Sequence, residues 1–254
     1  LERIQRIADE DNPLLPGSLR IGSVANADSG QFLWARERLR VLSADTPEAA
    51  IREYERMRRA KPLTDPQRYG LAVAKLRDGK AQAAVDDLTP LLAAHAGDAW
   101  IGLALGEAEA HAGRTADADA RFEALLARMP DNAAVALTYA GVLDERNTPA
   151  AGRRAQAVLR PLLGDAIADD PLFQQTFARA SEISGDPVRA GEAWAEAAYL
   201  NGRPEQALVQ LNTLKKRSDL DYYARARIDA RIAAITPVVL QLQKEGIHDE
   251  DLKR

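Results

Sequence analysis

The chain has 254 residues, and its 34 Lys and Arg against 38 Asp and Glu give a net charge of -4 at pH 7. This acidic balance argues against a nucleic-acid partner. The absence of Cys excludes disulfides, thiolate zinc sites and Cys nucleophiles. No run approaches the roughly 18 consecutive apolar residues of a membrane-spanning helix, and the many Ala and Leu residues beside few β-branched ones favour helices.

The first part of the chain has the composition of a connecting segment. Residues 1–28 contain Pro13, Pro16 and Gly17, and the pattern over residues 1–9 allows a short helix. The chain begins with Leu1 and shows no basic and apolar leader, so we expect the start of the encoded protein to lie upstream. Residues 1–28 are therefore interpreted as a linker or as the tail of a preceding domain.

A repeat of small and bulky residues organises the next part of the chain. Small residues recur at intervals of 34 residues at Ala50, Ala84 and Ala118, and bulky residues recur at the same interval at Tyr54, Leu88 and Phe122. This spacing is typical of tetratricopeptide helical hairpins. We expect copies over residues 31–64, 65–98 and 99–132, and a fourth that begins at Ala133.

Each part of the pattern has a physical reason within one hairpin. In the third copy, Gly106 and Ala118 are small, which lets two helices approach closely. Gly79 and Gly113 fall where a first helix ends, and Gly takes the left-handed conformation there without steric cost. Pro130 cannot continue a helix, so it should end the second helix of its copy. By the same argument, Pro161 predicts a kink or an early stop in the fourth copy.

After Pro171 the spacing shortens. One hairpin pattern contains Gly185 and Trp194, and the next follows 17 residues later at Gly202 and Leu211. We expect one helix over residues 187–200 to serve both hairpins, with an irregular insertion as the alternative. A last helix over residues 220–235 should cap the stack, with Pro237 breaking it before a helical tail.

These patterns predict an all-α protein: a right-handed superhelical stack of tetratricopeptide hairpins over residues 29–254, closed by a C-terminal capping helix. In such a stack the first helix of each copy lines an inner groove. The positions that should face this groove are mostly apolar and aromatic, and they are Phe32, Tyr69, Trp100, Leu103, Glu107 and Leu137. The groove is therefore a candidate site for a protein or peptide, and packing within the core is the alternative.

The same positions argue against one known mode of peptide binding. Adaptors of this fold that hold a C-terminal carboxylate use Lys, Arg and Asn in the groove. Here Ala35, Tyr69, Leu103 and Leu137 occupy the corresponding places. A carboxylate clamp is therefore not expected.

Catalytic and metal-binding patterns are missing from the sequence. The three His residues, His95, His111 and His248, are far apart, so no His-Glu-x-x-His motif exists. Glu107 and His111 stand one turn apart, but a metal site needs a further ligand. We therefore expect no enzyme activity, no metal and no cofactor in this chain.

One helix also carries a row of cations. Arg52, Arg56 and Arg59 follow one another at helical spacing in the first copy. Such a row is typical of a solvated face, with docking to an acidic partner as the alternative.

Four segments of the chain resemble one known family, and they span residues 1–4, 91–100, 195–207 and 226–232. The family is that of BepA-like bacterial periplasmic zinc metallopeptidases, and the resemblance is to their C-terminal tetratricopeptide-repeat domain. The resemblance implies a non-catalytic interaction module that acts in the periplasm, in outer-membrane protein assembly and quality control. Its implied partners are the assembly machinery, client outer-membrane proteins and its own peptidase domain, where zinc would be bound.

Two alternatives to this interpretation remain. The chain could be a free-standing tetratricopeptide scaffold of another bacterial assembly, or an enzyme in its own right. A leader peptide and a His-Glu-x-x-His helix upstream of Leu1 would favour the peptidase family. Turnover that a chelator abolishes would indicate an enzyme.

Overall fold

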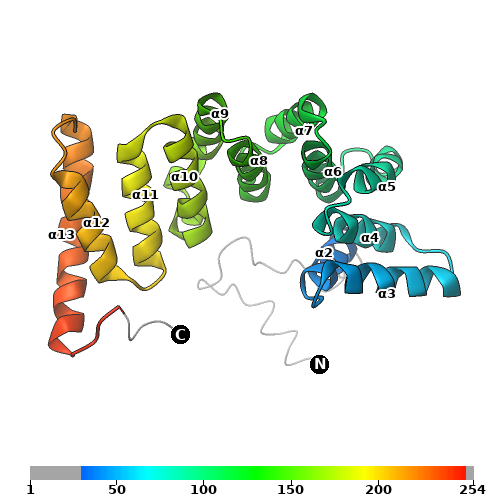
Figure 1. Cartoon of the computed structure of the whole chain (residues 1–254), viewed down its shortest axis with the longest axis horizontal. Coiled ribbons are helices and arrows are strands. Elements are labelled where there is room, and N and C mark those ends of the chain that lie inside the picture. The colour runs from blue at the N-terminus through cyan, green and yellow to red at the C-terminus, as the bar shows by residue number, and fades with distance from the viewer. Residues whose placement is uncertain (1–29, 250–254) are drawn as a thin grey trace, which may run out of the picture. The chain divides into compact units, whose positions relative to one another are not determined.

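The computed structural model describes residues 30–249. In this part of the chain all regular structure is helical, with twelve α-helices and two short 3₁₀ helices. The all-α prediction is confirmed, and the neighbouring helices pack in antiparallel pairs as in a helical repeat (Figure 1). The linker or domain tail predicted over residues 1–28 lies outside the described residues.

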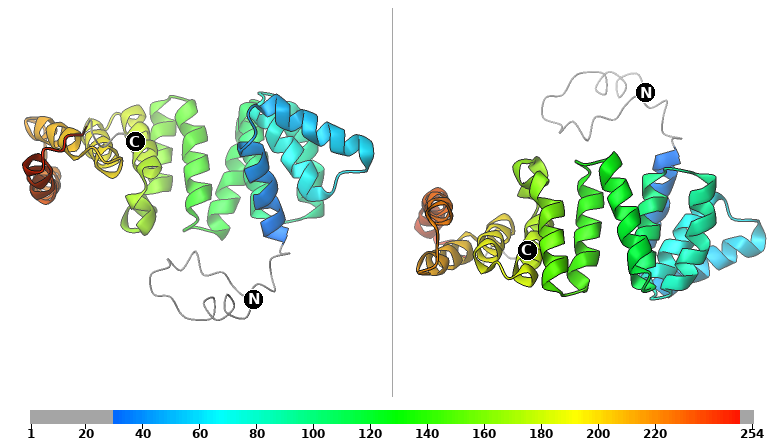
Figure 2. Two further views of the ribbon diagram at one scale, coloured as in Figure 1. Left: turned by 90° about the horizontal axis from the view of Figure 1, so that it is seen from below. Right: turned by 90° about the horizontal axis from the view of Figure 1, so that it is seen from above.

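The chain divides into two compact units, one up to Arg114 and the other from Thr115 onward. The helices of the first unit are α2 (Gly30–Leu42), α3 (Pro47–Ala60), α4 (Asp65–Arg77), α5 (Ala81–Ala94) and α6 (Ala99–His111). The helices of the second unit are α7 (Thr115–Arg128), α8 (Ala133–Glu145), α9 (Pro149–Leu159), η3 (Arg160–Gly164), η4 (Ala166–Asp169), α10 (Pro171–Ser184), α11 (Pro187–Leu200), α12 (Pro204–Lys215) and α13 (Tyr222–Lys244). Within each unit every α-helix packs against the next one along the chain (Figures 1 and 2).

The 34-residue repeat is visible in where the helices begin. Helices α4, α6 and α8 begin at residues 65, 99 and 133. Polar side chains fix several of these starts, since the Asp98 carboxylate accepts a hydrogen bond from the Ile101 amide at 3.1 Å and Asn132 caps α8 in the same way. Gly79 and Gly113 have φ of 75° and 77°, so the predicted left-handed ends are confirmed.

A buried polar contact joins the first three helices of the first unit. Tyr54, predicted as a bulky core residue, is fully buried and donates a hydrogen bond to the buried Glu37 carboxylate at 2.9 Å. Arg36 and Arg40 also bind this carboxylate, at 2.9 and 3.1 Å, which offsets the cost of burying it. Tyr54 can lie there because Gly70 has no side chain: a Cβ on Gly70 would come within 2.2 Å of the Tyr54 hydroxyl.

The core of the second unit follows the same repeat. Ala118 and Phe122 are fully buried, and the Phe122 ring stacks on Tyr139 with 4.8 Å between the ring centroids. Helix α9 ends at Leu159, two residues before Pro161, and η3 follows. The early stop predicted from Pro161 is therefore confirmed.

The shared helix predicted near the C-terminal end is present. Helix α11 covers residues 187–200, and it packs against both α10 and α12. One helix thus belongs to two successive hairpins, which explains why the sequence spacing shortens there.

The predicted end of the last helix was wrong. Helix α13 continues through Pro237 to Lys244 instead of stopping near residue 235. Proline lacks an amide proton and removes one backbone hydrogen bond. However, the Thr236 hydroxyl donates to the Ile232 carbonyl at 2.7 Å, and buried Ile235 and Val239 hold both sides of the proline against the core of this unit.

Candidate functional site

The groove positions predicted in the first unit differ in exposure. Tyr69 is fully buried, and its ring meets Trp34 edge to face with 5.6 Å between centroids. Its side chain therefore belongs to the core rather than to a groove surface. Burial raises the pKa of the Tyr69 phenol, against an opposing effect of the nearby Arg38 guanidinium.

The other predicted groove positions are more accessible. Trp100 is half-buried and packs against the core of the first unit. Leu103 and Glu107 are also half-buried on α6. Leu137 is half-buried on α8, in the second unit, and Phe32 is exposed on α2. Tyr69 thus packs within the core instead of facing a groove, and Trp100 does so in part.

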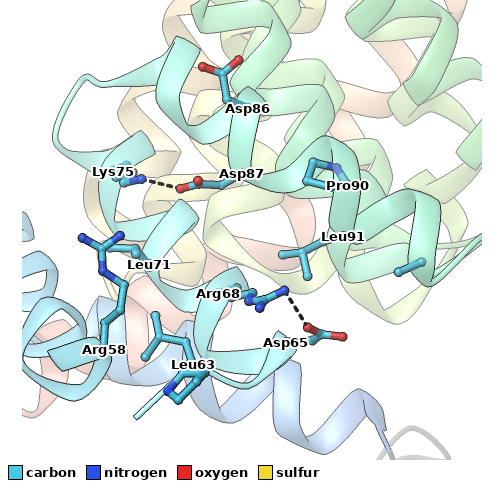
Figure 3. A pocket seen from close by; sticks show the side chains of 12 residues that line it. Arg58, Leu63, Asp65, Arg68, Leu71, Lys75, Asp86, Asp87, Pro90 and Leu91 are labelled. Carbon is cyan, nitrogen blue, oxygen red and sulfur yellow. Dashed lines mark hydrogen bonds and ion pairs between the residues drawn. The ribbon is translucent and has the colours of Figure 1, made fainter. Parts of the chain in front are cut away.

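A hollow that sequence reasoning did not single out lies among α3, α4 and α5 (Figure 3). This α3–α5 cavity has a volume of about 510 Å³. Its lining combines apolar side chains with three cations and three carboxylates. The lining residues are Arg58, Pro62, Leu63, Asp65, Arg68, Leu71, Lys75, Asp86, Asp87, Pro90, Leu91 and Ala94.

The apolar lining of the α3–α5 cavity includes three buried leucines. Leu63, Leu71 and Leu91 line it and belong to the hydrophobic core of the first unit. Pro90 lies inside α5 and is exposed beside them. A side chain that enters the cavity would therefore contact carbon atoms that are already fixed by the core, which lowers the entropic cost of binding.

Most of the charges around the α3–α5 cavity are paired within the protein. Lys75 and Asp87 join α4 to α5 at 2.5 Å, and Arg68 lies 3.4 Å from Asp65 at the start of α4 (Figure 3). Arg58 pairs with Glu55 on its own helix at 2.6 Å. The pairs of Arg68 and Arg58 are the more exposed ones, and such pairs are weak and can exchange their partners for groups of a ligand at small cost.

The second unit has a smaller hollow of about 190 Å³ beside α10, α11 and α13. Two ion pairs cross from α13 to α11 at its edge: Arg227 lies 3.1 Å from Glu192, and Arg231 lies 2.6 Å from Glu196. Arg231 also lies over the Tyr199 ring, 4.4 Å from its centroid. The guanidinium groups of Arg227 and Arg231 therefore help to hold the capping helix α13 against α11.

The candidate catalytic and metal-binding residues are dispersed. Among residues 30–249, no group of three or more His, Cys, Asp or Glu side chains is arranged to hold a metal ion. His95 binds the Asp65 carboxylate at 2.9 Å and meets the Trp34 ring edge to face. Glu107 and His111 lie on α6 as the sequence indicates.

The cationic row on α3 faces solvent. Arg52, Arg56 and Arg59 are exposed, and Arg56 pairs with Glu53 at 2.7 Å on the same helix. This arrangement agrees with the solvated face predicted from the sequence.

One buried carboxyl group was not anticipated from the sequence. Asp144 on α8 has a buried Oδ1 without a hydrogen-bond partner within the described part of the chain. Burial raises the pKa of this carboxyl to about 7, against a weaker opposing effect of Arg179. Its position near the end of an ordinary helix gave no sequence signal for this burial.

Comparisons with known proteins add no family assignment: no family model and no curated protein matches the chain. No helix formed by residues 30–249 is both long enough and apolar enough to cross a membrane.

Proposed function

We propose that this chain is a non-catalytic protein-interaction module, in which stacked helical hairpins hold a segment of a partner protein. The observation that carries the proposal is the α3–α5 cavity. It combines a preformed apolar lining with a half-buried ion pair between α4 and α5 and an exposed ion pair at the start of α4. Binding sites for flexible segments commonly have these two properties together.

The lining indicates what the bound segment contains. Leu63, Leu71 and Leu91 would receive an aliphatic or aromatic side chain, which contributes most of the binding free energy. The neighbouring Arg68 and Lys75 would bind carbonyl or carboxylate oxygens of the segment, and Asp87 would accept its amide protons. An extended stretch with one large apolar residue between polar residues fits this lining.

We further propose that the module serves a periplasmic zinc peptidase and chaperone in outer-membrane protein assembly and quality control. This step rests on the resemblance of residues 195–207 and 226–232 to the repeat domain of that family. Unfolded outer-membrane proteins alternate apolar and polar residues, so their segments suit the cavity chemistry. The second candidate is a free-standing scaffold of another assembly. The coding sequence upstream of Leu1 tests this choice, since a leader and a His-Glu-x-x-His helix would favour the peptidase.

The binding itself can be tested with two neighbouring alanines on α5. Ala94 and Ala93 are both exposed, but only Ala94 lines the α3–α5 cavity. The probe is an array of short peptides that covers the sequences of outer-membrane β-barrel proteins. We expect the chain to bind peptides with a large apolar residue, Ala94→Arg to weaken binding about tenfold or more, and Ala93→Arg to leave it unchanged. Equal effects of the two substitutions would place binding elsewhere, and an array without bound peptides would contradict the proposal.

A further inference from the structure

Helix α5 forms one wall of the α3–α5 cavity with two rows of side chains. Asp87 and Leu91 lie one turn apart and form the inner row, in which Asp87 is half-buried and Leu91 is buried. Asp86, Pro90 and Ala94 follow one another at intervals of four residues, line the same cavity and are all exposed. We call these three residues the α5 outer row. This row has a carboxylate at one end and apolar atoms along the rest.

The Asp86 carboxylate differs from the other charged groups of the cavity in its partners. The three cations of the lining each pair with another carboxylate: Lys75 with Asp87, Arg68 with Asp65 and Arg58 with Glu55. In the part of the chain that the structure describes, no cation pairs with Asp86 (Figure 3). It accepts a hydrogen bond from the neutral Gln82 amide on the same helix at 2.8 Å. The negative charge of Asp86 is therefore uncompensated.

An uncompensated carboxylate at the edge of an apolar cavity selects for a cationic group in the ligand. Asp86 can bind a Lys or Arg side chain without first losing an ion pair of its own. A carboxylate of the ligand at the same place would meet a like charge, which weakens binding. The α5 outer row thus combines an apolar contact surface with a preference for positive charge at one end.

The spacing of the α5 outer row indicates the spacing in the bound segment. A helix rises about 1.5 Å per residue, so Asp86 and Pro90 are separated by about 6 Å along the α5 axis. An extended segment rises about 3.3 Å per residue, and its alternate side chains point to the same side. Two residues of such a segment therefore span the distance from Pro90 to Asp86. An apolar side chain that contacts Pro90 and Leu91 would have the second residue from it at Asp86.

We infer that the α3–α5 cavity selects extended segments in which a Lys or Arg stands two residues from a large apolar residue, and that Asp86 binds this cation. The inference rests on the proposed function of the cavity and adds the charge and the spacing of the bound segment. A small free cation would leave the leucines of the cavity in contact with water, so a polypeptide segment is the ligand that uses both features.

The test uses four short labelled peptides with one Leu in a neutral polar background. Three carry Lys, Gln or Glu two residues before and two residues after the Leu, so that either chain direction is allowed. The fourth carries the same two Lys residues directly beside the Leu, where an extended chain points them to the opposite side. Binding to the full chain is measured by fluorescence anisotropy at low salt. We expect the first Lys peptide to bind about threefold more tightly than the Gln peptide and the fourth peptide, and about tenfold more tightly than the Glu peptide.

Substitutions at Asp86 test the place of the cation, and Asp45→Asn is the matched control. Asp45 is exposed in the connection between α2 and α3 and does not line the α3–α5 cavity. We expect Asp86→Asn to abolish the preference for Lys over Gln while the Gln peptide binds as before, and Asp45→Asn to leave the preference unchanged. Asp86→Lys should reverse the order, so that the Glu peptide binds more tightly than the Lys peptide. Circular dichroism checks that the helices of each variant are intact.

Three results would overturn the inference, and they differ in what else they contradict. Equal binding of the Lys, Gln and Glu peptides, with all three weakened by Ala94→Arg, would leave the proposed function standing and contradict only the charge selection. Equal effects of Asp86→Asn and Asp45→Asn would show that the net charge of the protein, and not Asp86, sets the preference. If none of the four peptides bound, the proposed function would fail and the inference with it.

Discussion

Gly152 on α9 lies in close contact with the backbone of α10. A Cβ at this position would lie 2.5 Å from the Ser184 amide nitrogen and 2.9 Å from the Ala180 carbonyl oxygen. Both atoms belong to the backbone of α10, so no side-chain rotation can relieve the overlap. Helices α9 and α10 can therefore pack this closely only because Gly152 has no side chain.

We expect Gly152→Ala to destabilise the protein by about 2 kcal/mol, because overpacking against backbone exceeds the gain in helix propensity. Gly141→Ala is the control, since a Cβ there would meet nothing within 4 Å and the position is inside α8. It should stabilise the protein by up to about 1 kcal/mol. Urea unfolding followed by circular dichroism measures both changes, and a loss of stability in both variants would contradict the geometric argument.

Asp144 should make stability depend on pH. Its pKa is raised to about 7 in the folded state, against an ordinary value near 3.8. The folded state therefore holds this proton more tightly than the unfolded chain does. The contribution of this group to the free energy of unfolding is fully present below about pH 4. It is lost as the pH rises through about 7.

The substitution Asp144→Asn should remove this loss of stability at high pH, because an amide does not ionise. We expect it to raise the unfolding midpoint clearly at pH 8 and much less at pH 5, as measured by thermal unfolding at each pH. The buried Oδ1 lacks a hydrogen-bond partner among the described residues, so an amide should not break an existing bond there. An increase of the same size at both pH values would show that the carboxyl is not desolvated.

At the scale of single helices, the sequence predicted most of the fold because each hairpin is specified locally. The small residue Ala84, the bulky residue Leu88 and the turn at Gly79 all belong to one copy, and their spacing alone indicates two packed helices. The shared helix α11 followed from the same spacing. The stop predicted at Pro237 failed because the side chains of Ile235 and Val239 bind both halves of α13 to neighbouring helices. Tertiary packing of this kind leaves no local signal.

The candidate site was less predictable than the helices. The positions in the expected groove were derived from repeat register, which places Tyr69 and Leu103 at equivalent positions, 34 residues apart. Register does not specify how deeply each residue lies, and Tyr69 is part of the core. The α3–α5 cavity requires Leu63 from a connection and Leu91 from α5 to meet, and both residues look like ordinary core in the sequence. Such a hollow depends on how three helices pack against one another.

At the scale of the whole molecule, contacts within each unit join helices that are close in chain order. Helix α10, for example, packs against α8, α9 and α11. Repeat proteins with such contacts respond to a local change locally, because their stability is a sum of individual repeat and neighbour contributions. Unfolding of this chain should therefore depend on which helices a probe reports.

The three tryptophans make this testable. Trp34 and Trp100 lie in the first unit and Trp194 in the second, so a Trp194→Phe variant reports only the first unit by fluorescence. In that background we expect Gly152→Ala to shift the part of the circular dichroism transition that comes from the second unit. The fluorescence transition should move by less than about 0.5 kcal/mol, as for distant, independent sites. If both signals shift equally, the 254-residue chain unfolds as one cooperative body and the repeat description of its stability is wrong.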